Sequence, residues 1–328
     1  MFFTVSGLRK FYGDRPVLRD VSFDVGAGEI VSIIGPSGVG KTTLLRIIAG
    51  LERADAGELR YGVTPSRENP VILVFQDYLL FPNLTVFENA AFGLRVRKLP
   101  KGEVERRVGA ILEYFHMNAM RELYPNQLSA GQRQRVAIAR AMVVNPAMLL
   151  LDEPFANLDR GLKLETAEFI RATQKEFGVT TIGVTHDLEE AFVMSDRIGL
   201  ILDGRLVQYD AADEVYYRPA SRAAADFLGP MNRLTPEQRA LVEVAGAAAP
   251  AAEASGDIFF RPEALRLDRD PVGPGVVEAV TFAGHYTKFD VRLAGRALVA
   301  YGTQNGVRPG DRVRLRVLSH LQSFRNDA

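Results

Sequence analysis

The chain contains no cysteine. That absence excludes a disulfide framework and every metal site built from thiolates, and it suits a reducing compartment. The sequence also lacks a charge imbalance, because Lys plus Arg and Asp plus Glu each number 40 and the formal net charge is zero. No overall field therefore draws the protein towards nucleic acid or an anionic membrane.

Long apolar runs are missing as well. No stretch reaches the roughly 18 apolar residues that a membrane-spanning helix requires. Met1–Gly7 has neither the basic start nor the apolar centre of a secretory signal peptide. We expect a chain without a signal peptide or a spanning helix, which would reach a membrane only by docking on a membrane protein.

What the chain does have is enough apolar sequence for two or three domains, since 47% of its 328 residues are hydrophobic. Over residues 1–230, apolar runs rich in β-branched residues alternate with helical patterns. These runs are Glu29–Ile34, Val71–Phe75, Ala147–Leu151, Thr180–Val184 and Arg197–Leu202. The alternation predicts an α/β fold with a mostly parallel sheet flanked by helices, and residues 78–142 are predicted to form a helical subdomain.

The composition changes after residue 230. Residues 231–257 are interpreted as a linker, because Ala245–Gly256 has few bulky side chains; a short Ala-rich helix before Pro250 is the alternative. Residues 258–322 contain short alternating stretches such as Arg312–Val317, whose arginines would all face solvent. We expect a small, barrel-like β-domain at this end of the chain.

One segment carries the strongest chemical signal. Residues 35–42 fit the pattern G-x-x-x-x-G-K-[ST] and lie between an apolar strand and a helical pattern. Glycines let successive backbone N–H groups turn towards an anion, and the following helix directs its N-terminal dipole at the phosphates. Lys41 would add a point charge for the β- and γ-phosphates, and Thr42 would place its hydroxyl on Mg²⁺. The predicted nucleotide-binding residues of this segment are Gly35, Pro36, Ser37, Gly38, Val39, Gly40, Lys41, Thr42 and Thr43.

A pair of carboxylates follows the apolar run at 147–151. Asp152, at the exit of a buried strand beside the phosphate loop, is predicted to hold Mg²⁺ directly or through water. Glu153 comes next and is predicted to orient and polarise the attacking water. Taken alone, such a pair could belong to a helix cap, but its combination with a phosphate loop favours the catalytic interpretation.

Leu128–Gln132 reads LSAGQ, and here the sequence resembles the ATP-binding cassette (ABC) ATPases, whose signature is LSGGQ. The resemblance covers roughly residues 3–230. It implies a P-loop fold with antiparallel β and helical subdomains, ATP and Mg²⁺ as ligands, and hydrolysis of ATP. Ala130 replaces the middle glycine of the signature. Because alanine tolerates positive φ poorly, the backbone there could differ slightly, and we expect activity to be retained.

The resemblance also assigns roles around the phosphate loop. Tyr12 looks like the aromatic residue that stacks on adenine, with a core or surface aromatic as the alternative. Gln76 resembles the glutamine that reaches Mg²⁺ or the attacking water and senses the membrane partner. His186 resembles the switch histidine that contacts the γ-phosphate. The expected catalytic residues are thus Glu153, His186 and Gln76, and the expected metal ligands are Thr42, Gln76 and Asp152.

A second set of residues would act across a dimer. Ser129, Gly131 and Gln132 match the signature and would contact the γ-phosphate of a nucleotide held mainly by another subunit. Asp159 resembles the D-loop aspartate, which also acts across the dimer. One chain holds one copy of each half, so the resemblance implies a head-to-tail homodimer that closes on ATP and reopens after hydrolysis.

Phe75–Val86 resembles the segment of bacterial importer subunits on which a permease docks. Tyr78, Leu80 and Phe81 are the predicted apolar contacts with the permease. Internal packing of these three side chains is the alternative.

The C-terminal stretch resembles the small β-domain called TOBE, through Phe260–Glu263 and Gly310–Val313. The resemblance implies the ATPase subunit of an importer on the cytoplasmic face of the inner membrane, with transmembrane permease subunits and, indirectly, a solute-binding protein as partners. The expected substrate is a small ion or polyamine, ahead of ferric iron, an oxyanion or a sugar. The alternative is a soluble ABC ATPase acting on nucleic acid or ribosomes. A single cassette without sustained heptads disfavours it, and no nucleic-acid partner is expected.

Overall fold

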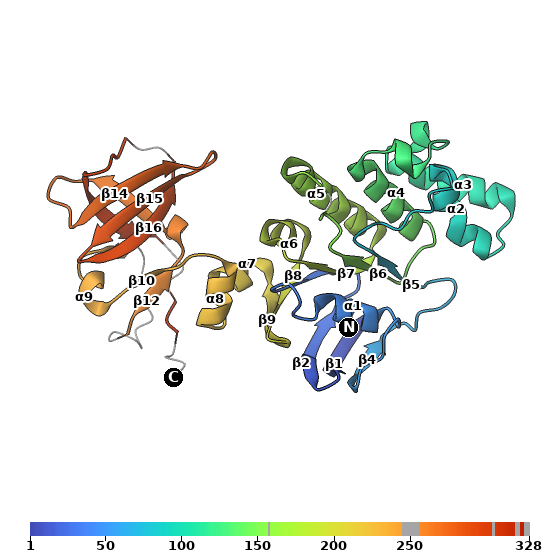
Figure 1. Ribbon diagram of the computed structural model, residues 1–328, viewed down its shortest axis with the longest axis horizontal. Coiled ribbons are helices and arrows are strands. Elements are labelled where there is room, and N and C mark those ends of the chain that lie inside the picture. The colour runs from blue at the N-terminus through green and yellow to red at the C-terminus, as the bar shows by residue number, and fades with distance from the viewer. Residues whose placement is uncertain (157, 245–255, 304–305, 319–321, 325–328) are drawn as a thin grey trace. The chain divides into compact units, whose positions relative to one another are not determined.

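The computed structural model describes residues 1–156, 158–244, 256–303, 306–318 and 322–324. The chain folds into two compact units, Met1–Ala212 and Asp213–Ala328 (Figure 1). The functional domain limits 1–230, 231–257 and 258–322 remain predictions. Within the predicted linker, residues 231–244 contain β10 (Asn232–Leu234), α9 (Pro236–Arg239) and β11 (Glu243–Val244), whereas 245–255 lie outside the described residues.

A six-stranded sheet forms the centre of the first unit, in the order β5-β6-β7-β3-β8-β9. The pairs from β5 to β8 are parallel, and only β9 runs antiparallel to its neighbour β8. The predicted mostly parallel sheet is therefore confirmed. The strands are β3 (Ile30–Ile34), β5 (Val71–Val74), β6 (Met148–Asp152), β7 (Thr180–Thr185), β8 (Arg197–Leu202) and β9 (Arg205–Ala211).

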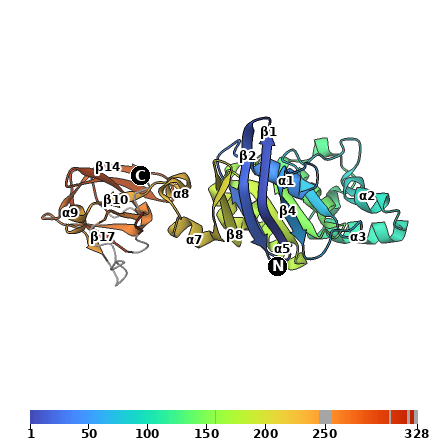
Figure 2. The same ribbon diagram turned by 90° about the horizontal axis from the view of Figure 1, so that it is seen from below.

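Both faces of this sheet are covered (Figure 1). One face packs on α1 (Lys41–Ile48) and on the antiparallel sheet β2-β1-β4, which Figure 2 shows from below. The other face packs on α4 (Ala130–Met142), α5 (Arg160–Phe177) and α6 (Leu188–Met194). Side chains of β6 alternate between the two cores, which explains why buried parallel strands appear in the sequence as continuous apolar runs. The antiparallel strands are β1 (Phe3–Tyr12), β2 (Arg15–Val25) and β4 (Ala56–Tyr61).

Helices occupy most of the segment between β5 and β6. They are α2 (Val86–Val96), α3 (Lys101–Tyr114), two 3₁₀ turns (Asn118–Met120 and Pro125–Gln127) and α4. Thr85 starts α2 with a capping box, because its hydroxyl accepts from Glu88 N while the Glu88 carboxylate accepts from Thr85 N. Local sequence therefore defines where this helix begins.

The second unit is dominated by a β-sheet in the order β11-β17-β14-β15-β16, with β13 also paired to β17. Along β17 (Arg312–Val317) buried apolar residues alternate with exposed arginines, so the predicted half-buried strand is confirmed. The P-loop type of α/β core followed by a small β-domain is the predicted fold class and is likewise confirmed. The other elements are α7 (Ala212–Tyr217), α8 (Arg222–Leu228), β12 (Ile258–Phe260), a 3₁₀ turn (Pro262–Ala264), β13 (Leu265–Arg269), β14 (Gly275–Phe282), β15 (Thr287–Leu293) and β16 (Arg296–Gly302).

Arg261 is the largest fully buried side chain of the second unit, at 1% exposure. Its guanidinium donates to the carbonyls of Gly229 (2.8 Å), Ala225 (3.2 Å) and Tyr216 (3.2 Å), and burial lowers its pKa. The contacts with Ala225 and Gly229 satisfy carbonyls at the end of α8, where the helix leaves them without intrahelical partners, and the contact with Tyr216 reaches α7. The arginine within the predicted TOBE motif thus ties α7 and α8 to the β-domain.

Candidate active site

The phosphate loop connects β3 to α1, and two of its glycines are required by the backbone. Gly35 has φ 153°, and a Cβ there would lie 2.3 Å from the carbonyl oxygen of Ile201. Gly40 has φ 107°, and a Cβ there would lie 2.9 Å from the carbonyl oxygen of Val17. No other residue type fits either position without moving backbone, so the loop geometry follows directly from the glycine spacing.

Lys41 is 5% exposed and begins α1. Its Nζ donates to the carbonyls of Gly35 (2.8 Å) and Pro36 (3.0 Å), which directs the ammonium group across the loop. Burial lowers the Lys41 pKa, while the nearby carboxylates of Glu153 and Asp152 raise it. The ammonium therefore faces the loop interior, where anionic phosphates would bind.

Asp152 ends β6 and accepts a hydrogen bond of 2.9 Å from the Thr42 hydroxyl. Burial and the neighbouring Glu153 raise the pKa of Asp152, whereas the Thr42 hydrogen bond, Arg46 and Lys41 lower it. A carboxylate and a hydroxyl oxygen therefore meet at one point beside the loop. Such hard oxygen donors suit Mg²⁺.

Glu153 occupies a strained backbone conformation with φ 45°. Its N–H donates to the Val184 carbonyl of the adjacent strand at 2.9 Å, which anchors this conformation. His186 follows β7, and its Nδ1 lies 3.2 Å from Glu153 Oε1. The structure thus brings together two predicted catalytic residues that are 33 positions apart in sequence (186 − 153).

Lys41, Thr42 and Glu153 line a cavity of about 400 Å³, within the size range of small-molecule sites, whereas Asp152 and His186 lie next to these residues and are not part of the lining. Tyr12 lies at its wall with half of its side chain exposed, and its hydroxyl donates to Glu52 at 2.6 Å. The cavity is lined by Tyr12, Arg15, Val17, Ser37, Gly38, Gly40, Lys41, Thr42, Thr43 and Glu153.

Arg15 and Val17 are cavity residues that sequence reasoning missed. Arg15 is the cross-strand partner of Tyr12 in the hairpin between β1 and β2. The turn at Gly13 and the strand pattern around it could have revealed this pairing, which places a guanidinium on the same wall as the predicted adenine-stacking ring.

The signature residues lie outside the lining of this cavity. Ser129 is the N-cap of α4 and forms a capping box with Gln132, whose side chain accepts from Ser129 N at 2.8 Å. Ala130 is the first residue of the helix and has no positive φ, so the missing glycine causes no strain. A Cβ on Gly131 would lie 3.1 Å from Leu162 Cδ2, so glycine allows α4 and α5 to approach closely.

Asp159 is the exposed N-cap of α5 and also lies outside that lining. Its neighbour Asn157, within the predicted D-loop, lies outside the described residues. Two groups of predicted residues therefore occupy different places on one chain.

The segment after β5 carries the exposed Gln76 and two residues with positive φ, Tyr78 (59°) and Leu79 (42°). Arg140 of α4 donates to the carbonyls of both, at 2.9 Å each. Tyr78 is only 3% exposed, and its hydroxyl donates to the Pro154 carbonyl at 3.2 Å. The prediction that Tyr78 contacts a permease is therefore wrong, because its ring packs internally.

Among the residues that the structure describes, none of the helices is both long enough and apolar enough to cross a bilayer. Groups of three or more His, Asp or Glu side chains that could hold a metal ion are also absent from that part of the chain.

Comparison with known families gives two matches. Residues 18–156 match the ABC transporter family, and residues 259–320 match the TOBE domain. The sulfate/thiosulfate import ATP-binding protein CysA of Yersinia pestis is 40% identical over 317 residues, covering 90% of this chain and 86% of the relative. The spermidine/putrescine import ATP-binding protein PotA of Thermotoga maritima is also 40% identical, covering 88% and 86% respectively.

Solved structures agree with these matches. The cbiO1 protein of Clostridium perfringens, part of the ABC transporter complex cbiONQ, is 31% identical with a TM-score of 0.62, covering 67% of this chain and 92% of its own. A dimeric ATP-binding cassette in a post-hydrolysis state with ADP and Pi is 31% identical with a TM-score of 0.56, covering 64% and 98%. The chain therefore belongs to the ABC transporter family, as an ATP-binding and ATP-hydrolysing subunit of the importer type with a C-terminal TOBE domain.

Proposed function

We propose that this subunit hydrolyses ATP at a composite site, formed by the phosphate-loop cavity of one chain and the Ser129 side of a second copy. The observation that carries the proposal is the separation of the two residue groups. Lys41, Thr42 and Glu153 line one cavity, whereas Ser129 and Asp159 lie outside it. A head-to-tail dimer supplies each cavity with the signature group that its own chain does not place there.

In and beside the cavity, each predicted side chain of this chain has a definite task. Tyr12 stacks on the adenine ring, and Lys41 with the loop N–H groups binds the β- and γ-phosphates. Glu153 accepts a proton from the attacking water at its carboxylate, which the strained backbone holds towards the cavity. His186 lies beside Glu153 and contacts the γ-phosphate. Gln76 reaches the same water from the segment after β5.

Magnesium fits the oxygen donors present. Thr42 and Asp152 would hold it together with phosphate oxygens, and Gln76 would be a further ligand. The ion would neutralise charge on the phosphates when bound. The protein residues themselves orient the nucleotide and the water.

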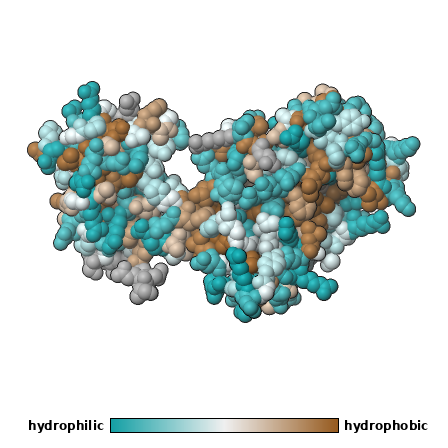
Figure 3. Space-filling view, in the orientation of Figure 1, coloured by the Kyte–Doolittle hydropathy of each residue, from teal (hydrophilic) through white to brown (hydrophobic). Residues whose placement is uncertain are grey.

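Coupling to transport requires a permease on the cytoplasmic side of the membrane, and we place its contact on the surface around Leu79 and Phe81. Both side chains are exposed, at 55% and 38%, and Phe81 stacks on Phe92 with ring centroids 4.5 Å apart. Hydrophobic residues are visible together on the first unit, in the region of α4 and β5 (Figure 3). An exposed apolar surface of this kind is typical of a protein contact.

The transported solute is proposed to be a small ion or a polyamine, delivered to the permease by a separate solute-binding protein. The names of the relatives support this range, since one group imports sulfate or thiosulfate and another spermidine or putrescine. No residue of the ATP site contributes to the choice between them.

The decisive variant is Glu153→Gln, which keeps the shape of the side chain but removes its basicity. We expect ATP binding to persist, turnover to fall by about 10²–10⁴-fold, and an ATP-bound dimer to accumulate in gel filtration. Glu165→Gln, an exposed change on α5, is the matched control and is expected to behave as wild type. A monomeric Glu153→Gln protein that still hydrolyses ATP at the wild-type rate would remove Glu153 from the mechanism.

A further inference from the structure

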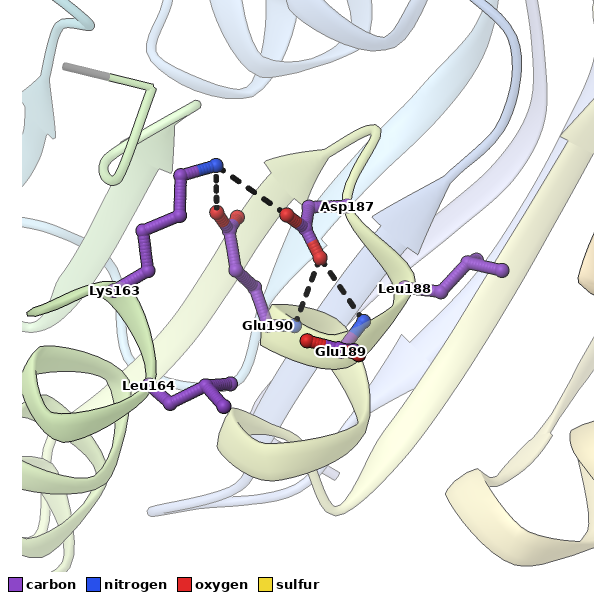
Figure 4. Close-up of a pocket in the computed structure, with 6 residues that line it drawn as sticks. All are labelled: Lys163, Leu164, Asp187, Leu188, Glu189 and Glu190. Carbon is purple, nitrogen blue, oxygen red and sulfur yellow. Dashed lines mark hydrogen bonds and ion pairs between the residues drawn. The ribbon is translucent and has the colours of Figure 1, made fainter. Parts of the chain in front are cut away.

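An ion cluster joins the starts of α5 and α6. Lys163 Nζ lies 3.0 Å from Glu190 Oε1 and 3.3 Å from Asp187 Oδ2. Figure 4 shows the lysine extending from α5 towards the two carboxylates, which both belong to the first turn of α6 or its cap. Glu190 is only 3% exposed, and an unpaired carboxylate there would be costly.

The two carboxylates hold the turn that carries His186. Asp187 caps α6, because its Oδ1 accepts from the N–H groups of Glu189 (3.0 Å) and Glu190 (3.3 Å). The Thr185 hydroxyl donates to Glu190 Oε2 at 2.6 Å and accepts from Asp187 N at 3.0 Å. His186 thus lies between two residues that the cluster fixes on either side.

The other end of the cluster lies on the side of the chain proposed to face a second copy. The N–H of Lys163 donates to the Asp159 carbonyl at 3.0 Å, within the first turn of α5. The preceding residue, Leu162, packs where a side chain on Gly131 would collide. Lys163 therefore connects the helix start at Asp159 to the turn at His186 through one side chain.

We propose that Lys163 is a positioning residue for hydrolysis, which transmits the placement of the Asp159 segment in the closed dimer to His186. The inference rests on the proposed roles of Asp159 and His186. The Lys163 ammonium is held by Asp187 and Glu190 and does not line the nucleotide cavity, so we expect it to act through His186 on the rate of the chemical step and not on ATP binding. Its charge is essential, because two carboxylates of the His186 turn are held by it.

The test uses the purified full-length protein, with kcat and KM for ATP measured separately. Lys163→Met is expected to lower kcat by roughly ten- to a hundredfold, because misplacing a reacting group by about 1 Å has this effect. KM should stay within about twofold of wild type. Lys163→Arg keeps the charge and is expected to retain most of kcat. A folded Lys163→Met protein with wild-type kcat would overturn the proposal.

The matched control is Lys175→Met on the same helix. It removes another lysine–carboxylate pair, Lys175 with Asp196 at 2.5 Å, and is expected to leave kcat and KM unchanged. If Lys175→Met slowed turnover as much as Lys163→Met, general loosening of α5 would explain both, and the proposal would be wrong.

Folding and function are separated by two more variants. The double variant Lys163→Met/Glu190→Gln also removes the buried carboxylate charge, so no unpaired charge is left at that position. We expect its circular dichroism spectrum to match that of the wild type and its kcat to stay low. A wild-type kcat in this double variant would show that the cluster only stabilises the fold. His186→Ala is measured alongside. A wild-type rate of ATP hydrolysis by His186→Ala would contradict the proposed role of His186. A low kcat for His186→Ala together with a wild-type kcat for Lys163→Met would contradict only the proposed coupling through Lys163.

Discussion

The two halves of the nucleotide site are built in different ways. In the phosphate-loop half, residues from distant parts of the sequence contact one another within one chain: Thr42 with Asp152, and Glu153 with His186. In the signature half, Ser129 interacts with its own helix through a capping box to Gln132. One half is thus organised by tertiary contacts and the other by a helix terminus.

The two halves also differ in the charges that they contain. Lys41 and Asp152 are buried charges whose pKa values move in opposite directions, because burial disfavours the charged form of each. The first turn of α4 holds no acidic residue, unlike that of α6 with Glu189 and Glu190. The dipole of α4 is therefore left uncompensated, as a terminus that meets a phosphate requires.

The largest effect on ATP hydrolysis is expected when one half of the site is inactivated in one chain and the other half in a second chain. Lys41→Ala should abolish hydrolysis, since loss of a buried charge contact to phosphate costs about 2–5 kcal/mol of binding. Gly131→Asp should abolish it as well, by placing a carboxylate where the signature meets phosphate. A mixture of the two inactive proteins should regain part of the wild-type rate, because one composite site in each mixed dimer has both halves intact.

Steady-state ATPase assays of the separate and mixed proteins, with circular dichroism for folding, decide the matter. The control is each variant alone, at the total protein concentration of the mixture, and it should stay inactive. No recovery in the mixture, with both proteins folded and dimers present, would mean that the halves act within one chain.

A smaller effect is expected at the caps of two helices. Ser129→Ala removes the α4 cap and should cost about 1 kcal/mol of stability and also slow hydrolysis. Thr85→Ala removes the equivalent capping box of α2 and should cost a similar stability while leaving hydrolysis of the purified subunit unchanged. Urea titrations and ATPase rates measured on both proteins give the comparison. Equal rates for the two would show that Ser129 is only a helix cap.

The same contrast explains how much could be predicted from sequence. The phosphate loop was predictable because its chemistry is contiguous, and two of its glycines are required because a Cβ at Gly35 or Gly40 would lie 2.3 Å or 2.9 Å from a carbonyl oxygen. The central strands were predictable because both faces of the sheet are buried, which leaves uninterrupted apolar runs. The start of α4 was predictable from Ser129 and Gln132, which form a local cap.

What could not be predicted depends on contacts between distant segments. The inward position of Tyr78 results from hydrogen bonds to Pro154 and Arg140, both more than sixty residues away in sequence. The cavity position of Arg15 follows from hairpin register, and the cluster around Lys163 from the packing of α5 beside α6. The Lys163 cluster leaves no periodic or motif signal in the chain. For Arg15, the turn at Gly13 indicates the hairpin but not the cavity beside it.

The smallest expected effect concerns the start of β3, the strand that leads into the phosphate loop. Asp196 accepts from Ile30 N at 2.9 Å and pairs with Arg171 at 2.8 Å and Lys175 at 2.5 Å. Burial alone would raise the Asp196 pKa, but the hydrogen bonds from Lys175, Ile30 and Arg171 outweigh it and lower the pKa. A lowered folded-state pKa means that the carboxylate stabilises the fold above its unfolded pKa of about 3.9, and that this contribution disappears as the pH falls through the folded value.

Asp196→Asn should therefore lower the free energy of unfolding at pH 7 by at most about 1 kcal/mol, because these ion pairs are partly exposed and screened. The deficit should begin to shrink below pH about 4, where the carboxylate of the unfolded chain becomes protonated, and should approach zero once the pH is below the lowered pKa of the folded state. Denaturant titrations across this range measure it, with Asp20→Asn, at a half-exposed pair with Arg9, as the control that stays near wild type throughout. If the loss of unfolding free energy did not depend on pH, the effect would come from packing and not from the charge. If Asp196→Asn also lowered the rate of ATP hydrolysis at pH 7, the phosphate-loop half would depend on this anchor more than its own internal contacts imply.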